Sequence, residues 1–301
     1  MGKLGALIST IAFGVLVAFA VAALTAVPAT GRPATVTMVG AGDMTSCSHA
    51  NDTDTARLLG RIPGTVFTLG DNVDPRGTAQ NYRDCYAPTW GRYKSRTRPA
   101  IGNHDYDGTV RAEPYFDYFG TARAGTVRRG FYSYDRGAWH IVVLNSNCDR
   151  IDGCGKTSVQ GRWLRKDLAR NANRCTMAYF HHPLYATGNG TATAQVKPFW
   201  TMLQKRGADL ILSGHAHRYE RYAPMTPNGR RSANGIRQFV VGTGGEPGGT
   251  EIHREDAPNL QVVKHSVSGV LRLSLKPGSY SWRFVPVAGQ RFTDSGTSRC
   301  R

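Results

Sequence analysis

The 301-residue sequence predicts an α/β fold with two mixed β-sheets flanked by helices, a four-layer α/β/β/α sandwich. Three observations lead to this prediction. Short apolar runs alternate with amphipathic segments, which favours an α/β sheet architecture. Several of these runs stop at a Gly, Asp, Asn or His, as strands do where they reach a functional edge. After residue 199 the chain becomes richer in β-forming segments, which predicts a second sheet packed on the first.

The strands are expected where short runs of Val, Ile, Leu and Phe occur, because such runs are typical of buried strands. The predicted strands are residues 35–39, 66–69, 99–101, 176–180, 209–212, 236–241, 269–275 and 280–285. The last two are expected to form a hairpin around Pro277-Gly278. The clearest helix is predicted over 158–171, where Trp163, Leu164 and Leu168 fall on one face.

The N-terminal segment is predicted to be a targeting sequence rather than part of the fold. Lys3 precedes an apolar stretch over 4–24, and small residues follow as far as Ala29. This order is typical of a secretory signal, here residues 1–29, with cleavage after Ala29. An uncleaved membrane anchor is the alternative, because the apolar stretch approaches the length that spans a bilayer. Either way, the folded domain over 35–301 is expected to be secreted or held at the extracytoplasmic surface.

The six cysteines agree with export, because their number is even and they include no CxxC pair. In an oxidising compartment such a set predicts disulfides. Cys148 and Cys154 close a short loop and form the first predicted pair. Six cysteines allow 15 connectivities, so the further pairs, Cys47–Cys85 and Cys175–Cys300, are a working hypothesis.

The net charge of the chain is strongly positive, with 38 Lys and Arg against 21 Asp and Glu. A field of this sign attracts phosphate esters, lipid headgroups and anionic wall polymers. The charges are scattered and are not interleaved with aromatic residues, which argues against a specific nucleic-acid surface. An anionic cell-surface polymer therefore stays a candidate partner, beside the plainer interpretation of a soluble basic surface.

Five predicted strands are each followed by a short polar motif. These motifs are Gly42-Asp43, Gly70-Asp71-Asn72, Gly102-Asn103-His104-Asp105, His181-His182-Pro183 and Gly214-His215-Ala216-His217. Each alone has an ordinary interpretation as a helix cap or turn. Together they bring carboxylates and imidazoles to one sheet edge, and such ligands suit Zn, Mn or Fe. The ordered set therefore predicts a metal site.

In this order the five motifs resemble those of the calcineurin-like metallophosphoesterases. The continuation Tyr219-Glu220-Arg221 is similar to the purple acid phosphatase branch, and the resemblance spans residues 36–285. It implies an enzyme that hydrolyses small phosphate esters with two metal ions, bridged by a carboxylate and a hydroxide. The resemblance implies phosphomonoesters as substrates, attacked by the metal-bound hydroxide.

The resemblance also assigns roles to individual residues. Asp71 would bridge the two metals; one metal would also take Asp43 and His217, and the other Asn103, His181 and His215. His181 is preferred to His182 because the family's ligand lies two residues before a proline. His104 would bind the phosphate and protonate the leaving group. Asp105 would orient His104 and His182 would contact substrate, although both have an equally good structural interpretation.

Two positions depart from the family pattern. Many members have a His where this chain has Thr45, and purple acid phosphatases have a Tyr where it has Asp74. We therefore expect a protein that is not purple. The hypothesis is that Asp74 ligates the first metal directly or through water, with His49 a weaker substitute. Two divalent ions become plausible, and the metals are expected among Fe, Mn and Zn.

Two glycine-rich segments, 188–190 and 242–245, are expected to flank the pocket, with ordinary loops as the alternative. Two rival functions stay open. A phosphodiesterase or nucleotidase would use the same metals with a different pocket. A non-catalytic protein would bind anionic polymers through its positive charge, with affinity that falls steeply as salt rises.

Overall fold

The computed structural model describes residues 1–2, 5, 35–44, 47, 51–171, 175–188, 191–249 and 252–301. Nearly all of the predicted signal over 1–29 lies outside the described residues, so it stays a prediction. The chain divides into two units, Met1–Arg32 and Pro33–Arg301, and the second carries every described helix and strand. No helix in the described ranges has the length and apolar character needed to cross a membrane.

The first sheet has six strands in the order β13-β12-β11-β1-β2-β3. Its members are β1 (Val36–Ala41), β2 (Thr65–Leu69), β3 (Thr97–Ala100), β11 (Gly269–Lys276), β12 (Ser279–Pro286) and β13 (Ser295–Arg299). Strands β1, β2 and β3 are parallel to one another, whereas β11, β12 and β13 pair antiparallel. Lys276 pairs with Ser279, which confirms the predicted hairpin around Pro277-Gly278.

The second sheet has seven strands in the order β10-β8-β9-β7-β6-β5-β4. Its members are β4 (Tyr132–Arg136), β5 (Trp139–Val143), β6 (Cys175–Tyr179), β7 (Leu210–Ser213), β8 (Tyr219–Tyr222), β9 (Arg237–Val241) and β10 (Leu260–Lys264). The central strands β5, β6, β7 and β9 are parallel, and the outer strands are antiparallel. All eight predicted strands are present, and the structure adds β4, β5, β8, β10 and β13.

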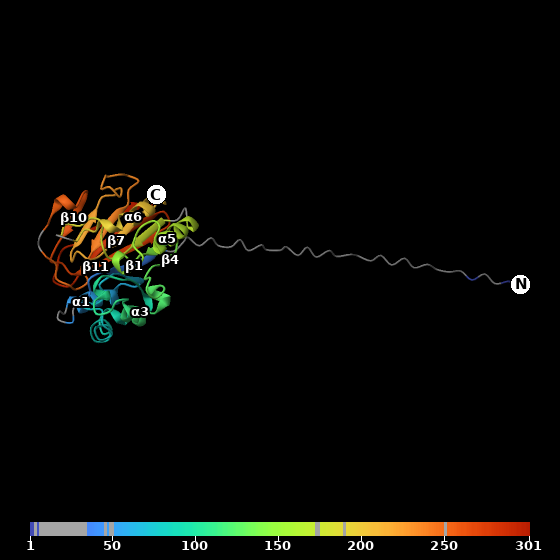
Figure 1. Cartoon of the computed structure of the whole chain (residues 1–301). Helices are drawn as coiled ribbons and strands as arrows, with labels where there is room; N and C mark the ends of the chain where they lie inside the picture. The colour runs from blue at the N-terminus through green and yellow to red at the C-terminus, as the bar shows by residue number, and fades with distance from the viewer. Residues whose placement is uncertain are drawn as a thin grey trace. The chain divides into compact units, whose positions relative to one another are not determined.

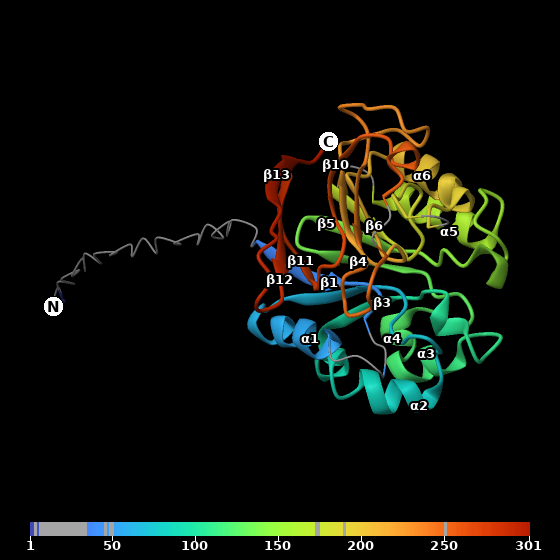
Figure 2. The same cartoon turned by 90° about the vertical axis from the view of Figure 1, so that its left-hand side faces the viewer.

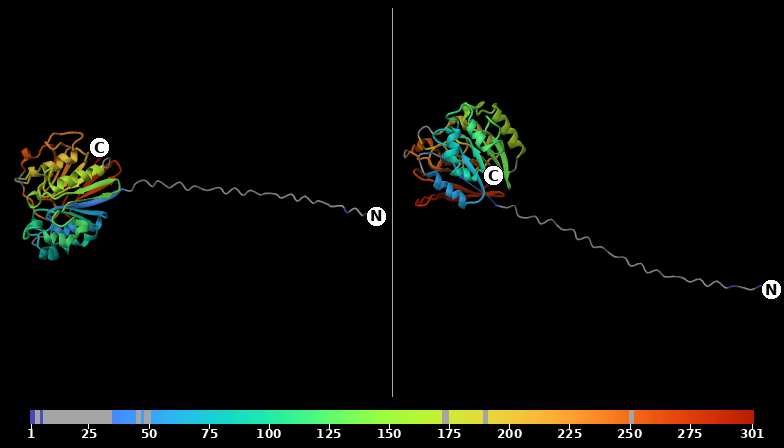
Figure 3. Two further views of the ribbon diagram at one scale, coloured as in Figure 1. Left: turned by 45° about the vertical axis from the view of Figure 1, so that its right-hand side comes forward. Right: turned by 90° about the horizontal axis from the view of Figure 1, so that it is seen from below.

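The two sheets are layered between helices, which confirms the predicted four-layer sandwich (Figures 1 and 2). Side chains alternate across the second sheet: Ile141 belongs to one buried cluster and Val142 to the other. The first cluster joins the two sheets, and the second packs under the outer helices α5 (Val159–Arg170) and α6 (Lys197–Gln204). Helices α1 (Asn51–Arg61) and α3 (Glu113–Phe119) lie on the other side of the sandwich (Figure 3).

The remaining helical segments are short and lie within the connections between strands. They are α2 (Ala79–Asn81), α4 (Thr121–Ala124), η1 (Tyr82–Tyr86), η2 (Trp90–Arg96), η3 (His104–Tyr106), η4 (Cys148–Arg150), η5 (Ala194–Val196) and η6 (Arg254–Asp256). The predicted helix over 158–171 is α5. It begins after Ser158, whose side chain accepts a hydrogen bond from the Gly161 amide at 3.0 Å, as a helix N-cap does.

Three disulfides are formed, and they match the predicted pairs Cys47–Cys85, Cys148–Cys154 and Cys175–Cys300. Cys175 begins β6 in the seven-stranded sheet, and Cys300 follows β13 in the six-stranded sheet. This bond therefore cross-links the two sheets. Because it closes a loop of 125 residues, it restricts the unfolded chain more than the six-residue Cys148–Cys154 loop does.

A buried histidine connects β4, β5 and α5. The side chain of His140 is only 3% exposed, with Nδ1 2.9 Å from Asp135 Oδ1 and Nε2 2.7 Å from Asp167 Oδ2. Both ring nitrogens face carboxylates, so both donate and the ring is an imidazolium. Burial alone lowers the pKa of His140, but the hydrogen bonds to Asp167 and Asp135 outweigh it and the pKa is raised.

This arrangement predicts pH-dependent stability. His140→Gln should lower the free energy of unfolding by about 1–3 kcal/mol, because it removes a charged donor from between two carboxylates. Since the folded pKa is raised, the contribution is full below the unfolded pKa of 6.5 and is lost as pH rises through the folded pKa. Urea unfolding of both proteins across this range checks the prediction. A difference that does not shrink with rising pH would contradict it.

Candidate metal centre

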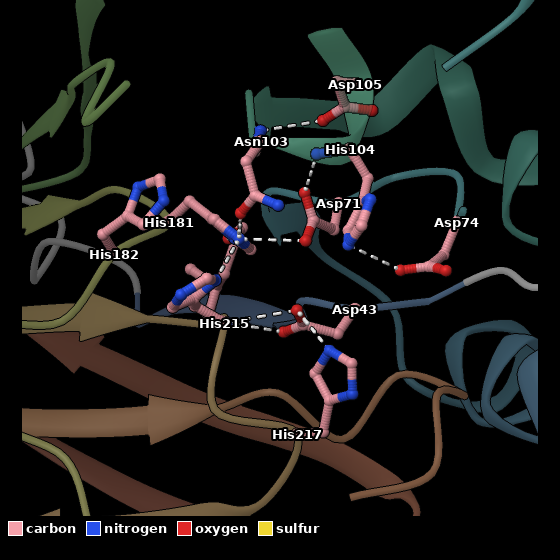
Figure 4. A network of polar contacts seen from close by, with 12 residues as sticks. Asp43, Asp71, Asp74, Asn103, His104, Asp105, His181, His182, His215 and His217 are labelled. Carbon is pink, nitrogen blue, oxygen red and sulfur yellow. Dashed lines mark hydrogen bonds and ion pairs between the residues drawn. The ribbon is translucent and has the colours of Figure 1, made fainter. Parts of the chain in front are cut away.

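All ten predicted site residues lie at one edge of the sandwich, at the carboxyl ends of strands from both sheets (Figure 4). From the six-stranded sheet, Asp43 follows β1, Asp71 and Asp74 follow β2, and Asn103, His104 and Asp105 follow β3. From the seven-stranded sheet, His181 and His182 follow β6, and His215 and His217 follow β7. The site thus depends on both sheets being held together.

Three further electron-pair donors lie close to the Nε2 atom of His181, so four such atoms cluster at this point. It lies 3.0 Å from Asp71 Oδ2, 2.9 Å from Asn103 Oδ1 and 3.1 Å from His215 Nδ1. On the other side of the ring, Nδ1 donates to the Leu69 carbonyl at 2.8 Å. That bond leaves the Nε2 lone pair directed into the site, as in metal-binding histidines. A proton or a cation must therefore balance the groups around Nε2.

The electrostatics of this group favour a positive charge. Burial alone lowers the pKa of His181, but the contact with Asp71 outweighs it and raises the pKa to about 9. Burial alone raises the pKa of Asp71, yet the imidazoles of His181, His104 and His215 together lower it. A carboxylate, an amide oxygen and two imidazoles in contact fit a divalent ion of the Zn, Mn or Fe type.

A second group lies beside the first. His217 Nε2 is 3.4 Å from Asp43 Oδ1, and its Nδ1 donates to the Pro247 carbonyl at 3.1 Å. Ligand atoms of Asp43, Asp71 and His181 lie within 4.8 Å of one another. Asp71 thus contacts His181 in the first group, and Asp43 contacts His217 in the second, so the two groups adjoin.

The backbone is turned sharply at three of these residues. Asp43, Asp71 and His215 adopt φ values of 58°, 46° and 68°. This left-handed region is uncommon for residues other than glycine and costs about 1 kcal/mol or more. Each of these residues lies two positions after the end of a strand, where the chain turns away from the sheet.

Several glycines pack so closely against the candidate ligands that no Cβ atom would fit. A Cβ on Gly102 would lie 2.1 Å from Asp71 Oδ1, and one on Gly70 would lie 2.5 Å from His181 Nδ1. A Cβ on Gly214 or Gly242 would lie 2.6 or 2.7 Å from Asp43 Oδ2. The predicted role of the 242–245 loop in shaping the pocket agrees with this close approach. The glycines in the motifs thus make room for the ligands.

Both the backbone amide and the ring of His104 are fixed by contacts with carboxylates. The His104 amide donates to Asp71 Oδ1 at 2.8 Å, and its Nδ1 donates to Asp107 Oδ2 at 2.8 Å. Its Nε2 lies 3.3 Å from Asp74 Oδ2. Sequence reasoning missed Asp107; the signal was its spacing of three residues from His104, which a helical turn brings onto one side.

The structure corrects the expectation that Asp105 orients the His104 ring. Asp105 is fully buried and points away, accepting hydrogen bonds from Gly102 N at 2.8 Å, Tyr82 Oη at 2.5 Å and Asn72 Nδ2 at 2.9 Å. Burial and the nearby Asp71 raise its pKa to about 6. Asp105 thus links the loop after β2 to the loop after β3, because it accepts hydrogen bonds from Asn72 in the first and from Gly102 in the second.

His182 packs beside the first group and also lines the cavity next to it. Ligand atoms of His181, His182 and His215 lie within 4.8 Å of one another, so these three residues form a further group that could hold a metal. Ser146 Oγ accepts a hydrogen bond from the His182 amide at 3.0 Å and lies 2.8 Å from His182 Nδ1. Burial lowers the pKa of His182 well below its usual value, and His181 and His215 lower it further. Sequence reasoning missed Ser146.

A cavity of about 500 Å³ opens beside His182 and Asn103. Its walls come from the segments after β5 and before α6, and they include Arg150 and Asp149. Gly188, expected to flank the pocket, does not line it, and residues 189 and 190 lie outside the described residues. The cavity adjoins the metal ligands and has room for a small phosphate ester.

Asp74 lies at the outer margin of the site. Its ligand atoms fall within 4.8 Å of those of Asp71 and His104, so they form a third group that could hold a metal. Burial alone raises the pKa of Asp74, and it stays raised although His104 opposes this. Thr45 and His49, the other positions considered for the first metal, lie outside the described residues.

Comparison with known proteins gives a consistent result. A family model described as calcineurin-like phosphoesterase matches residues 43–219. Purple acid phosphatase 15 of Arabidopsis thaliana is 25% identical over 244 residues, covering 69% of this chain and 45% of that protein. Probable inactive purple acid phosphatase 9 of the same plant is 26% identical over 239 residues, covering 66% and 33%. The chain thus spans half or less of the length of these curated relatives.

A solved structure shares the fold. The purple acid phosphatase PPD1 from yellow lupin (Lupinus luteus) seeds superposes with a TM-score of 0.70 at 19% sequence identity. The match covers 89% of this chain and 54% of the lupin chain. It supports the four-layer architecture described above.

The contact between Gly102 and Asp71 can be tested by adding one carbon atom. Gly102→Ala should lower metal content at limiting metal by about tenfold, because the added Cβ must displace the Asp71 carboxylate. Gly155→Ala is the matched control, since a Cβ there meets nothing within 4 Å. Equal metal content in the two folded variants, measured by elemental analysis after dialysis, would contradict the prediction.

The role of Asp74 is tested in the same way. Asp74→Ala should reduce bound metal by up to one ion per chain or weaken its affinity by about tenfold, because a carboxylate at the first site is lost. Metal titration followed by elemental analysis is the measurement. Unchanged stoichiometry and affinity would show that Asp74 acts only through its contact with His104.

Proposed function

The chain belongs to the calcineurin-like phosphoesterase family, and on that premise we propose that it is a secreted metal-dependent hydrolase of phosphomonoesters. One observation carries the proposal. Asp71 Oδ2, Asn103 Oδ1 and His215 Nδ1 all lie within 3.1 Å of His181 Nε2, which is a ligand set for a divalent ion. The curated relatives are longer than this chain, so the activity rests on the site rather than on their names.

Two metal ions are proposed, with Asp71 shared between them. Asp43, His217 and Asp74 would complete the first site; Asn103, His181 and His215 would complete the second. Two such ions, when bound, lower the pKa of a water molecule and neutralise charge on the phosphoryl group. The donor set fits Mn, Zn or Fe. Residue 74 is Asp and not Tyr, so the tyrosinate that makes a ferric site purple is not expected at this position.

His104 is proposed to protonate the leaving group. Its Nδ1 proton is held by Asp107, so Nε2 is the atom that faces the substrate. Burial alone lowers the pKa of His104, but Asp71 and Asp74 outweigh it and the pKa is raised. A histidine with a raised pKa carries the proton that a departing alkoxide needs.

The cavity beside the metal ligands supports a monoester as substrate. His182 lines it, and Arg150 supplies a fixed positive charge on its wall. A phosphomonoester carries up to two negative charges, whereas a diester carries one, so donors and cations favour the monoester.

Export is proposed on two grounds. The sequence begins with a stretch typical of a secretory signal, and the described domain contains three disulfides. Such bonds persist in oxidising compartments. The substrate would accordingly be met outside the cytoplasm.

The proposal is tested by His104→Ala with p-nitrophenyl phosphate as substrate. We expect about two metals per chain in both proteins. Turnover by the variant should be slower by about two to four orders of magnitude, because proton transfer to the leaving group is lost. His265→Ala is the matched control, since His265 follows β10 and, in the described part of the chain, its ring hydrogen-bonds only with Ser266. Elemental analysis and steady-state kinetics supply both readouts.

The other outcomes decide between the rival functions. Faster hydrolysis of bis(p-nitrophenyl) phosphate than of the monoester would identify a phosphodiesterase. A folded protein supplied with Mn, Zn or Fe that neither binds metal nor hydrolyses either compound would be a binding protein instead.

A further inference from the structure

A second, larger cavity lies away from the metal ligands. This groove has a volume of about 780 Å³ and runs beside α5 and α6, which lie together on the outer face of the seven-stranded sheet (Figure 1). Five of the nine residues that line it are basic, and none is acidic. The basic residues are Lys156, Arg165, Lys197, Lys205 and Arg206. Lys and Arg make up only about one residue in eight of the chain, so the groove is strongly enriched in them.

These five cations lack an ion-pair partner among the residues that the structure describes. Within the described part of the chain, none of their side chains forms an ion pair or a side-chain hydrogen bond. All five are exposed. Cations gathered around a hollow without partners repel one another and raise the local positive potential. The natural ligand of such a hollow is an anion with several charges.

The groove continues toward the metal-centre cavity. Ala194 lines both hollows, and the segment that follows it carries Lys197 into the groove. A second segment also borders both: Cys148 and Arg150 line the metal-centre cavity, and Lys156 lines the groove. The Cys148–Cys154 disulfide ties this second segment together. A long ligand could therefore lie along both hollows at once.

We propose that the groove binds the inner phosphate groups of a linear phosphate polymer whose terminal phosphate enters the metal-centre cavity. This inference rests on the proposed phosphomonoesterase function and specifies its substrate class. A nucleic acid is disfavoured, because the groove is lined by no aromatic residue on which bases would stack. Its other lining residues are small or apolar, including Pro198 and Met202, which suits a thin chain.

The reaction on such a chain balances as a simple hydrolysis. A water oxygen forms a bond to the terminal phosphorus, and the bond between that phosphorus and the bridging oxygen breaks. The bridging oxygen leaves with the chain and takes up a proton, which balances the proton that the attacking water loses. The products are orthophosphate and a chain that is one phosphate shorter. Inorganic polyphosphate and a polyol-phosphate chain with a terminal phosphate share this chemistry.

The test compares substrates of different length in a charge-reversal variant. Lys197→Glu with Lys205→Glu should raise KM for long-chain inorganic polyphosphate at least about tenfold, because two phosphate contacts become repulsive. It should change kcat/KM for p-nitrophenyl phosphate less than about twofold, since neither residue lines the metal-centre cavity. Tripolyphosphate should behave like the small substrate. Phosphate-terminated polyglycerol phosphate, assayed alongside, distinguishes the two polymer sources.

The matched control is Arg272→Glu with Lys276→Glu, which makes the same change in net charge on exposed positions of β11. It should leave the KM for polyphosphate within about twofold of wild type. Equal losses in the control and groove variants would show that the overall field attracts the polymer, and would overturn the inference. Equal losses on long and short substrates would overturn it as well.

Direct binding separates this inference from the proposed function. Fluorescence anisotropy of labelled long-chain polyphosphate should show at least about tenfold weaker binding to the groove variant than to wild type. That result in a protein with no phosphatase activity would uphold the groove and reject the proposed function. An active enzyme whose polyphosphate binding is unchanged by the groove substitutions would reject the groove alone.

Discussion

The structure around the site depends on one electrostatic constraint, the burial of two carboxylates that must be balanced by positive charge. Asp43 and Asp71 are almost inaccessible to solvent, and each contacts an imidazole. A buried carboxylate without a partner costs several kcal/mol. The left-handed turns and the glycines beside them follow from this constraint. They let several polar groups approach one point, which regular strands with bulky side chains would prevent.

The constraint also explains why the two sheets must be fixed to each other. Asp71 and Asn103 come from the six-stranded sheet, whereas His181 and His215 come from the seven-stranded sheet. Their contacts near 3 Å exist only while the sheets keep their relative position. The shared apolar cluster between the sheets and the Cys175–Cys300 bond both oppose sliding. Core packing far from the site therefore acts directly on ligand geometry.

The sequence predicted the strands that carry ligands better than those that do not. Parallel strands such as β6 are short apolar runs that end in a recognisable polar motif. Strand β5 was missed because His140 interrupts its apolar run, and the structure shows that this histidine is buried between two carboxylates. Missing β5 also concealed Ser146, which follows it and hydrogen-bonds with the amide and the ring of His182. Sequence reasoning assigned Asp105, the immediate neighbour of His104, whereas the carboxylate that faces the His104 ring is Asp107, one helical turn further along the chain.

The distribution of positive charge bears on how binding and catalysis would be divided. Charge spread over the surface speeds the arrival of anions but does not choose among them. Cations placed along a groove that leads to the metal centre hold the part of a substrate that does not react. Such contacts are the same in the bound substrate and in the transition state, so they lower KM without raising kcat. Preference for long chains would then arise in the groove, while the rate of hydrolysis would be set by the ligands and His104. The two properties could change independently, because Ala194 alone among the described residues lines both hollows.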